Sequence, residues 1–256
     1  MRKPRFFCQP ADRCGDHFRL PEGEAHHARS VLRLREGDAV LILDGSGYEH
    51  DAVLEAAPPG EGWLQARVVA SRLRPTEPDI DLILLQGLPK SDKMDLVVQK
   101  ATELGVRRVA PVLTERCVSR PEPGRAAAKV DRWQKIAQEA SKQAGRSITP
   151  QVAPVAALKE ALQALPYGCR LVVPWEEERR RSLREVAAEW LAKARPDQPS
   201  AVAVLIGPEG GLAEGEVEEA RRRGGITVTL GPRVLRTETA GLVALACLLF
   251  ATGNLE

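Results

Sequence analysis

The chain has few aromatic residues and almost no net charge. Aromatic residues make up 4% of the 256 residues, which argues against stacking on many aromatic side chains as the main mode of any nucleic-acid contact. The 37 basic and 35 acidic residues leave a net charge of +2, whereas a nucleic-acid-binding domain is often strongly basic. Any contact with a polyanion must therefore come from local groups of basic residues.

Cysteines are few, and their arrangement argues against structural disulfide bonds. The five cysteines are scattered, odd in number and without a C-x-x-C motif, so we expect no disulfide framework and a reducing, cytoplasmic location. Cys8 and Cys14 lie near His17 and His26 in the sequence, but the spacing matches no standard zinc pattern. We expect small buried thiols there and no metal site.

Long apolar runs and phosphate-binding motifs are also missing. The N-terminus has no apolar segment of the signal-peptide kind, and the longest uncharged run, which contains Thr239 to Asn254, is shorter than the roughly 20 residues that span a bilayer. We therefore expect no membrane association. No G-x-x-x-x-G-K-[ST] occurs and no G-x-G-x-x-G follows a predicted strand, so neither a P-loop nor a Rossmann site is supported.

The order of apolar runs predicts two domains joined by a short linker. Residues 1–71 contain short β-like runs separated by glycine and proline turns, as in a small β-barrel. Residues 72–78 contain two prolines without an apolar period, and we interpret them as a linker. Residues 79–256 alternate strand and helix patterns, which predicts an α/β domain with a parallel sheet covered by helices on both faces. The charge run Glu176 to Arg181 is most simply a solvated loop.

Two glycine-bearing segments near the C-terminus carry the strongest functional signal. Residues 205–212 read LIGPEGGL and residues 230–240 read LGPRVLRTETA. Each follows a buried strand pattern and opens a helical pattern, so both lie at the sheet edge where α/β proteins bind ligands. Because glycine permits sharp bends and close approach of a ligand, the pair predicts a nucleotide-like cofactor held by backbone.

These two motifs, in this order, resemble the bacterial 16S rRNA uracil-N3 methyltransferases of the RsmE family, within the SPOUT superfamily. Other segments match along the whole chain, and these are Arg2 to Phe7, His26 to Arg33, Lys90 to Asp95, Gln99 with Lys100, Glu115 to Cys117, and Glu139, Ala140, Gln143 and Arg146. The resemblance implies a PUA-like RNA-binding β-barrel followed by a SPOUT α/β domain with a C-terminal trefoil knot. It also implies an enzyme that uses S-adenosyl-L-methionine and works as a homodimer.

The resemblance implies a set of site residues. Cofactor contacts are expected in three loops, at Val173, Pro174, Ile206, Gly207, Glu209, Gly210, Gly211, Leu230, Gly231, Leu235, Arg236, Thr239 and Ala240. Methylation at N3 of uridine requires removal of a proton, so Arg236 is expected to stabilise the developing anion. Glu238 could accept the proton if burial raised its pKa, although a carboxylate in the first turn of a helix is also favoured by the helix dipole.

Basic residues supply the expected RNA contacts, because Arg and Lys side chains bind phosphates. The candidates are Arg2, Arg5, His26, Arg29, Arg33, Lys90, Lys93 and Arg146. Arg146 could instead meet a partner subunit, and the sequence does not choose between the two. The helices 94–104 and 240–251 are the candidate dimer surfaces.

The predicted substrate is a uridine of 16S rRNA, within the assembled 30S subunit. Two alternatives stay open at this point. The chain could be a SPOUT methyltransferase for another rRNA or tRNA position, or a non-catalytic RNA-binding assembly factor. The intact glycine loops argue against the second alternative, because a pure RNA-binding protein does not need a cofactor site.

Overall fold

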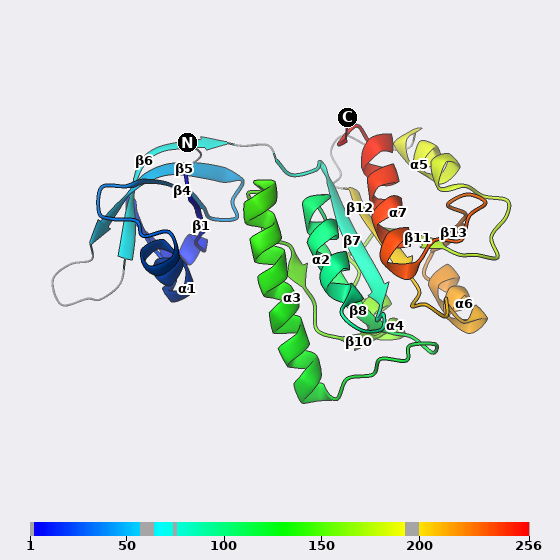
Figure 1. Ribbon diagram of the computed structural model, residues 1–256. Helices are drawn as coiled ribbons and strands as arrows, with labels where there is room; N and C mark the ends of the chain where they lie inside the picture. The colour runs from blue at the N-terminus through cyan, green and yellow to red at the C-terminus, as the bar shows by residue number, and fades with distance from the viewer. Residues whose placement is uncertain (1–2, 57–63, 74–75, 193–199, 256) are drawn as a thin grey trace. The chain divides into compact units, whose positions relative to one another are not determined.

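The computed structural model describes residues 3–56, 64–73, 76–192 and 200–255 (Figure 1). The chain divides into two compact units, of which the first contains residues 1–77 and 141–149 and the second contains residues 78–140 and 150–256. The linker expected at residues 72–78 stays a prediction, since Arg72 and Leu73 belong to a strand and residues 74–75 lie outside the described residues. Residues 141–149 belong to the first unit, whereas the sequence predicts them in the second domain.

The first unit is built on a six-stranded sheet in the order β1-β4-β5-β6-β3-β2. β1 runs parallel to β4, and all other neighbours are antiparallel. Residues Phe6, Phe18, Ile42 and Leu54 are fully buried in its core. The expected β-rich N-terminal domain is therefore confirmed, and its strands are β1 (Arg5–Phe7), β2 (Arg13–Cys14), β3 (His17–Arg19), β4 (Ala39–Leu43), β5 (Tyr48–Ala56) and β6 (Leu64–Leu73).

The helical part of the first unit is short. A 3-10 turn, η1 (Pro10–Asp12), follows β1, and α1 (Glu22–His26) continues into a π-helical turn, η2 (His27–Val31). The helical turns end before Arg33, because Arg33 adopts a left-handed backbone with φ of 53°, which a helix cannot include.

The second unit contains a seven-stranded parallel sheet in the order β10-β8-β7-β12-β11-β13, with β9 beside β8. Every pair in it is parallel, so the predicted α/β class is confirmed. The trefoil knot stays a prediction. The strands are β7 (Ile80–Gly87), β8 (Arg108–Leu113), β9 (Gln151–Val152), β10 (Ala156–Ala157), β11 (Arg170–Pro174), β12 (Ser200–Ile206) and β13 (Ile226–Val228).

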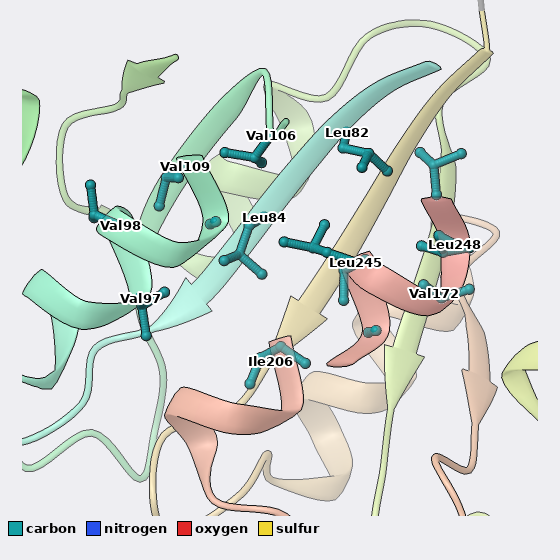
Figure 2. Packing of buried hydrophobic residues seen from close by; sticks show 14 of the residues in the cluster. Leu82, Leu84, Val97, Val98, Val106, Val109, Val172, Ile206, Leu245 and Leu248 are labelled. Atoms are coloured by element: carbon teal, nitrogen blue, oxygen red, sulfur yellow. The ribbon is translucent and has the colours of Figure 1, made fainter. Parts of the chain in front are cut away.

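Alternating side chains of the strands build two apolar layers. Leu82 and Leu84 of β7 face α2 (Lys93–Glu103), α3 (Pro123–Ala144), α5 (Leu183–Ala192) and α7 (Thr237–Ala251), and Figure 2 shows part of this cluster. Ile83 and Leu85 face the opposite layer, which contains α4 (Leu158–Gln163) and α6 (Glu214–Arg222). Burial of both faces explains the continuous apolar runs of the strands.

Two local features complete the second unit. α2 begins at Lys93 with Asp92 as its N-cap. Ser91, one residue earlier, takes a left-handed backbone with φ of 56° and directs the chain from β7 into the helix. No helix within the described ranges combines the length and hydropathy that a membrane crossing needs.

Candidate active site

Four loops meet at one edge of the parallel sheet. β7, β12, β11 and β13 are neighbours in this order, and their carboxyl ends point the same way because the strands are parallel. The loop after β7 contains Lys90, and the loop after β12 is 207–213. The chain after β11 and the loop 229–236 before α7 complete the group. This is the edge at which open α/β sheets bind ligands.

Two adjoining cavities lie among these loops. The first cavity has a volume of about 370 Å³ and the second about 500 Å³. They share a wall made by Pro174, Trp175, Glu176, Val234, Leu235 and Ala240. Both volumes lie within the range of roughly 300–1,000 Å³ that is usual for small-molecule sites.

Most residues expected to contact the cofactor line these cavities. The first cavity is lined by Pro174, Ile206, Gly207, Glu209, Gly211, Leu235, Arg236 and Ala240, and the second by Pro174, Leu230, Gly231, Leu235 and Ala240. Three expected residues line neither cavity. Val173 is buried in the core between the sheet and α6, Thr239 is exposed on α7, and Gly210 lies against Arg116.

The loop after β12 has its shape because two of its residues are glycine. A Cβ on Gly207 would lie 2.7 Å from the carbonyl carbon of Gly211, so the loop can fold back on itself only without a side chain at this position. Gly211 has a φ of +72°, a left-handed conformation that L side chains rarely adopt. The turn therefore exposes its backbone to the first cavity.

Gly210 lies against the loop that follows β8. A Cβ on Gly210 would lie 3.1 Å from the Cβ of Arg116, and Arg116 Nη1 donates a hydrogen bond of 2.9 Å to the Gly210 carbonyl oxygen. This contact helps to hold the glycine turn in place. The expected contact of Gly210 with the cofactor stays a prediction.

A buried hydrogen-bond chain joins the same turn to the start of α7. Gln86 is fully buried at the end of β7, and its Nε2 donates to Thr237 Oγ1 at 2.8 Å. Thr237 Oγ1 in turn donates to the carbonyl oxygen of Gly207 at 2.6 Å. The positions of two cavity walls are thus fixed by a polar contact that is shielded from water.

Lys93 links two of the loops by charge. Its Nζ lies 3.0 Å from Glu209 Oε1 and 3.2 Å from Glu238 Oε2. The hydrogen bond with Glu209 and the contact with Glu238 raise the pKa of Lys93. The backbone amide of Lys90 also donates to Glu209 Oε1, at 3.1 Å. Lys93 lines the first cavity, but its ammonium group is already paired with the carboxylates of Glu209 and Glu238.

The electrostatics of Glu238 argue against its role as a base. Burial by itself raises the pKa of Glu238, but its own backbone amide, Lys93 and the charge of Arg236 bring the pKa below its ordinary value. A carboxylate with a lowered pKa is a poor proton acceptor at neutral pH. The condition on which the sequence assigns Glu238 as a base is therefore not met.

Arg236 is the N-cap residue of α7 and is exposed at the wall of the first cavity. Within the described residues, its guanidinium has no hydrogen bond or ion pair. The backbone carbonyl of Arg236 accepts the amides of Thr239 and Ala240, which fixes the start of the helix. Arg236 thus presents an unpaired cation to any ligand in the cavity.

The expected RNA-binding residues fall into different environments. His26 and Arg29 line a hollow of about 740 Å³ in the first unit together with Arg19, while Arg33 is exposed beyond the helical turns. Arg5 is partly buried, and its Nη1 donates to the carbonyl oxygen of Lys142 at 3.5 Å. Arg2 lies outside the described residues.

Arg146 does not have the expected placement. Its side chain is only 3% exposed, and its Nη2 lies 2.5 Å from Glu77 Oε2 within the first unit. A buried guanidinium requires a paired carboxylate, and this pairing leaves it inaccessible to a phosphate. We therefore correct the RNA-binding assignment of Arg146 to a structural one.

The sequence interpretation expected a cofactor loop after β11 but named no residue of it beyond Pro174. Glu176 and Arg179 belong to the charge run expected to be a solvated loop, yet Glu176 lines both cavities and Arg179 lines the second. Trp175 lies in the shared wall, with the guanidinium of Arg221 5.3 Å from its ring centre. The position of this run directly after a buried strand, at the binding edge, was the signal that could have identified it.

Known proteins match the chain over most of its length. A family model described as an RNA methyltransferase domain matches residues 76–249, and one described as an RNA methyltransferase PUA domain matches residues 20–65. Ribosomal RNA small subunit methyltransferase E of Bacillus subtilis is 34% identical over 235 residues, which cover 92% of this chain and 90% of that protein.

Solved structures of similar proteins also match the chain over nearly its whole length. The ribosomal RNA small subunit methyltransferase E of Neisseria gonorrhoeae, bound to S-adenosyl methionine, has a TM-score of 0.79 at 32% identity and covers 97% of this chain and 98% of that one. A putative methyltransferase of Legionella pneumophila, in complex with the same cofactor, has a TM-score of 0.80 at 28% identity, with 98% of each chain covered. The chain therefore belongs to the RNA methyltransferase family that includes ribosomal RNA small subunit methyltransferase E.

Proposed function

We propose that this protein transfers a methyl group from S-adenosylmethionine to N3 of a uridine in 16S rRNA. The observation that carries the proposal is the pair of adjoining cavities at the carboxyl edge of the sheet, whose walls contain both glycine-bearing motifs of the family. Family membership supports the reaction class, and the names of the relatives support small-subunit rRNA as the substrate. A cytoplasmic location is part of the proposal, since ribosomal subunits are found there.

The residues of the cavities fit the cofactor. The Gly207–Leu212 turn has no side chain at Gly211 to fill the first cavity, and Leu230, Leu235 and Ala240 offer apolar contacts beside backbone polar groups. Apolar walls with a few convergent polar groups are typical of cofactor sites. When bound, S-adenosylmethionine supplies an electrophilic methyl group, and the protein must supply the orientation and the nucleophile.

Arg236 is the residue to which we assign stabilisation of the nucleophile. The N3 atom of uridine carries a proton at neutral pH, and negative charge spreads to the neighbouring carbonyl oxygens as that proton leaves. An exposed guanidinium at the cavity wall can donate two hydrogen bonds to such an oxygen. Because the guanidinium binds the uracil anion more strongly than neutral uracil, it lowers the barrier to methyl transfer.

Removal of the N3 proton of uridine needs no basic side chain of the protein. Glu209 and Glu238 lie nearest to Lys93, and both have a pKa below the ordinary value: burial opposes this shift, but hydrogen bonds to backbone amides and to Lys93 outweigh it. We propose that the N3 proton passes to water while Arg236 stabilises the anion. Lys93, with Glu209 and Glu238, then holds the two loops together.

RNA binding is proposed for exposed basic residues in each unit. In the first unit these are Arg29, Arg33 and His26, and in the second they are Lys90 and Arg236. Contacts of this kind with phosphates position the substrate and make its binding sensitive to salt. The assembled 30S subunit is the substrate that we propose.

A homodimer is proposed through α7. Phe250 is 71% exposed on this helix although α7 contains no charged residue after Glu238. Cys247 is exposed on the same side, and Leu96 on the neighbouring α2 is 44% exposed. An exposed apolar face of this kind is typical of a surface that packs against a second copy.

The proposed function is tested in a strain from which the protein has been removed. Mass spectrometry of nucleosides from 16S rRNA should show loss of N3-methyluridine, and restoring the wild-type protein should return it. An unchanged N3-methyluridine content would reject the proposal. Loss of a methylated nucleoside from tRNA instead would favour the alternative of a different RNA substrate.

A further inference from the structure

One acidic side chain of the site has no role in the proposal above. Glu176 follows β11 and lies in the wall that the two cavities share. Its Oε1 is 2.7 Å from the point that a Cβ on Gly211 would occupy. The absence of a side chain at Gly211 thus leaves room for this carboxylate against the glycine turn.

The other carboxylates around the cavities have ion-pair or hydrogen-bond partners within the protein. Glu209 and Glu238 both contact Lys93. Glu178 accepts hydrogen bonds from Thr227 Oγ1 at 2.8 Å and from the amide of Arg180 at 2.8 Å. Among the described residues, Glu176 has neither an ion pair nor a hydrogen bond through its carboxylate. It is the unpaired negative charge at the junction of the cavities.

The cofactor carries a positive charge that a carboxylate at this position would attract. S-adenosylmethionine has an adenosyl part, an amino-acid part, and a positively charged sulfonium between them. A ligand that extends through both cavities has its middle at their shared wall, where Glu176 lies. Its ammonium group, by contrast, is at one end of the molecule.

We propose that Glu176 faces the sulfonium and makes the site bind S-adenosylmethionine more tightly than S-adenosylhomocysteine, whose sulfur is neutral. The inference rests on the proposed function. It also has a consequence for turnover: methyl transfer removes the positive charge, so the attraction to Glu176 disappears and the product is released more readily. Because Glu176 is exposed, its contribution is modest and screened by salt.

Calorimetry with three ligands tests the role of Glu176. The ligands are S-adenosylmethionine, S-adenosylhomocysteine, and sinefungin, which carries an ammonium-bearing carbon in place of the sulfonium. In Glu176→Gln, we expect the affinities for S-adenosylmethionine and sinefungin to fall by a factor of roughly 1.5 to 5, the range of an exposed charge pair, and that for S-adenosylhomocysteine to stay unchanged. Glu177→Gln is the matched control, because Glu177 is exposed and adjacent but lines neither cavity.

Other outcomes separate the two proposals. An equal loss for all three ligands would place Glu176 near the α-ammonium, and no loss would remove it from recognition; either result overturns the inference and leaves the proposed function intact. If the wild type binds none of the three ligands, the proposed function fails and the inference fails with it. The wild type offers a second readout without any substitution, because its preference for S-adenosylmethionine over S-adenosylhomocysteine should shrink as salt is added.

Discussion

The hydroxyl of Thr237, the first residue of α7, donates a hydrogen bond of 2.6 Å to the carbonyl oxygen of Gly207, the first residue after β12. Thr237 is buried and also accepts a hydrogen bond from Gln86. Residues that are 30 positions apart in the sequence are thus joined at the base of the first cavity. A preformed wall reduces the entropy that ligand binding must otherwise overcome.

Removal of this hydroxyl should weaken both stability and cofactor binding. Thr237→Val removes the hydroxyl partner of the Gly207 carbonyl and leaves the Gln86 amide only its bond to the Gly87 carbonyl oxygen, which should lower the free energy of unfolding by about 1–3 kcal/mol. Urea unfolding measures this loss, and calorimetry should show weaker binding of S-adenosylmethionine. Thr237→Ser keeps the hydroxyl and should retain most of the affinity; equal losses in the two variants would contradict the role of the hydrogen bond.

The two adjacent glycines of the turn should respond differently to alanine. Gly211→Ala places a Cβ in a left-handed backbone, at a cost of about 1–2 kcal/mol, and displaces the Glu176 carboxylate. We expect a clear loss of cofactor affinity by calorimetry. In Gly210→Ala the new Cβ meets Arg116 outside the cavity, so affinity should change little. The reverse order of effects would show that the wrong glycine has been assigned to the ligand.

Arg236 should matter for chemistry more than for binding. If it stabilises the uracil anion, Arg236→Ala should lower the single-turnover rate of methyl transfer by roughly 10²–10³, the scale for loss of one oxyanion donor. Arg236→Lys should recover only part of the rate, because an ammonium lacks the planar fork of a guanidinium. A near-normal rate in Arg236→Ala with saturating RNA would refute the assignment.

Glu238 should contribute to stability in a pH-dependent way. Its pKa in the folded protein lies below its ordinary value of 4.5, so its charge stabilises the fold above that pH, and this stability is lost as the pH falls through the lower, folded-state pKa. Urea unfolding should therefore show that Glu238→Gln is less stable than wild type at pH 7, with the difference shrinking in acid. A pH-independent difference would mean that the charge of Glu238 is not responsible.

The apolar face of α7 should determine the oligomeric state. Phe250→Glu introduces a charge at an exposed position, so it should leave folding intact while disfavouring association through this face. Sedimentation velocity should show a dimer for wild type and a monomer for the variant. Tyr167→Glu is the matched control, because Tyr167 is fully exposed outside any helix. A wild-type monomer, or a dimer that survives the substitution, would contradict the proposed interface.

Periodicity predicted the elements of the second unit well, because buried parallel strands and amphipathic helices leave strong local patterns. Strands and helices alternate along most of this unit, as the sequence predicts. Local patterns failed where the backbone is left-handed at a residue other than glycine. Arg33 and Ser91 both have positive φ, and neither arginine nor serine is a residue type that indicates this conformation.

The sequence predicted which loops form the site, but not which side chains pair with one another there. The glycine motifs indicated which strands border the ligand, and most of their residues do line the cavities. Pairings such as Lys93 with Glu238 and Arg146 with Glu77 join distant positions, and no local pattern encodes them. These pairings decide which charges remain available, so the roles of Glu238, Arg146 and Glu176 emerged only from the structure.

The site that contains Arg236 is proposed to transfer a methyl group to N3 of a 16S rRNA uridine. A direct test incubates purified protein and unmethylated 30S subunits with S-adenosylmethionine that bears a deuterated methyl group, followed by mass spectrometry of the rRNA nucleosides. We expect deuterated N3-methyluridine with wild type and almost none with Arg236→Ala in the same time. Label in another nucleoside, or no label with wild-type protein that binds the cofactor, would refute this reaction.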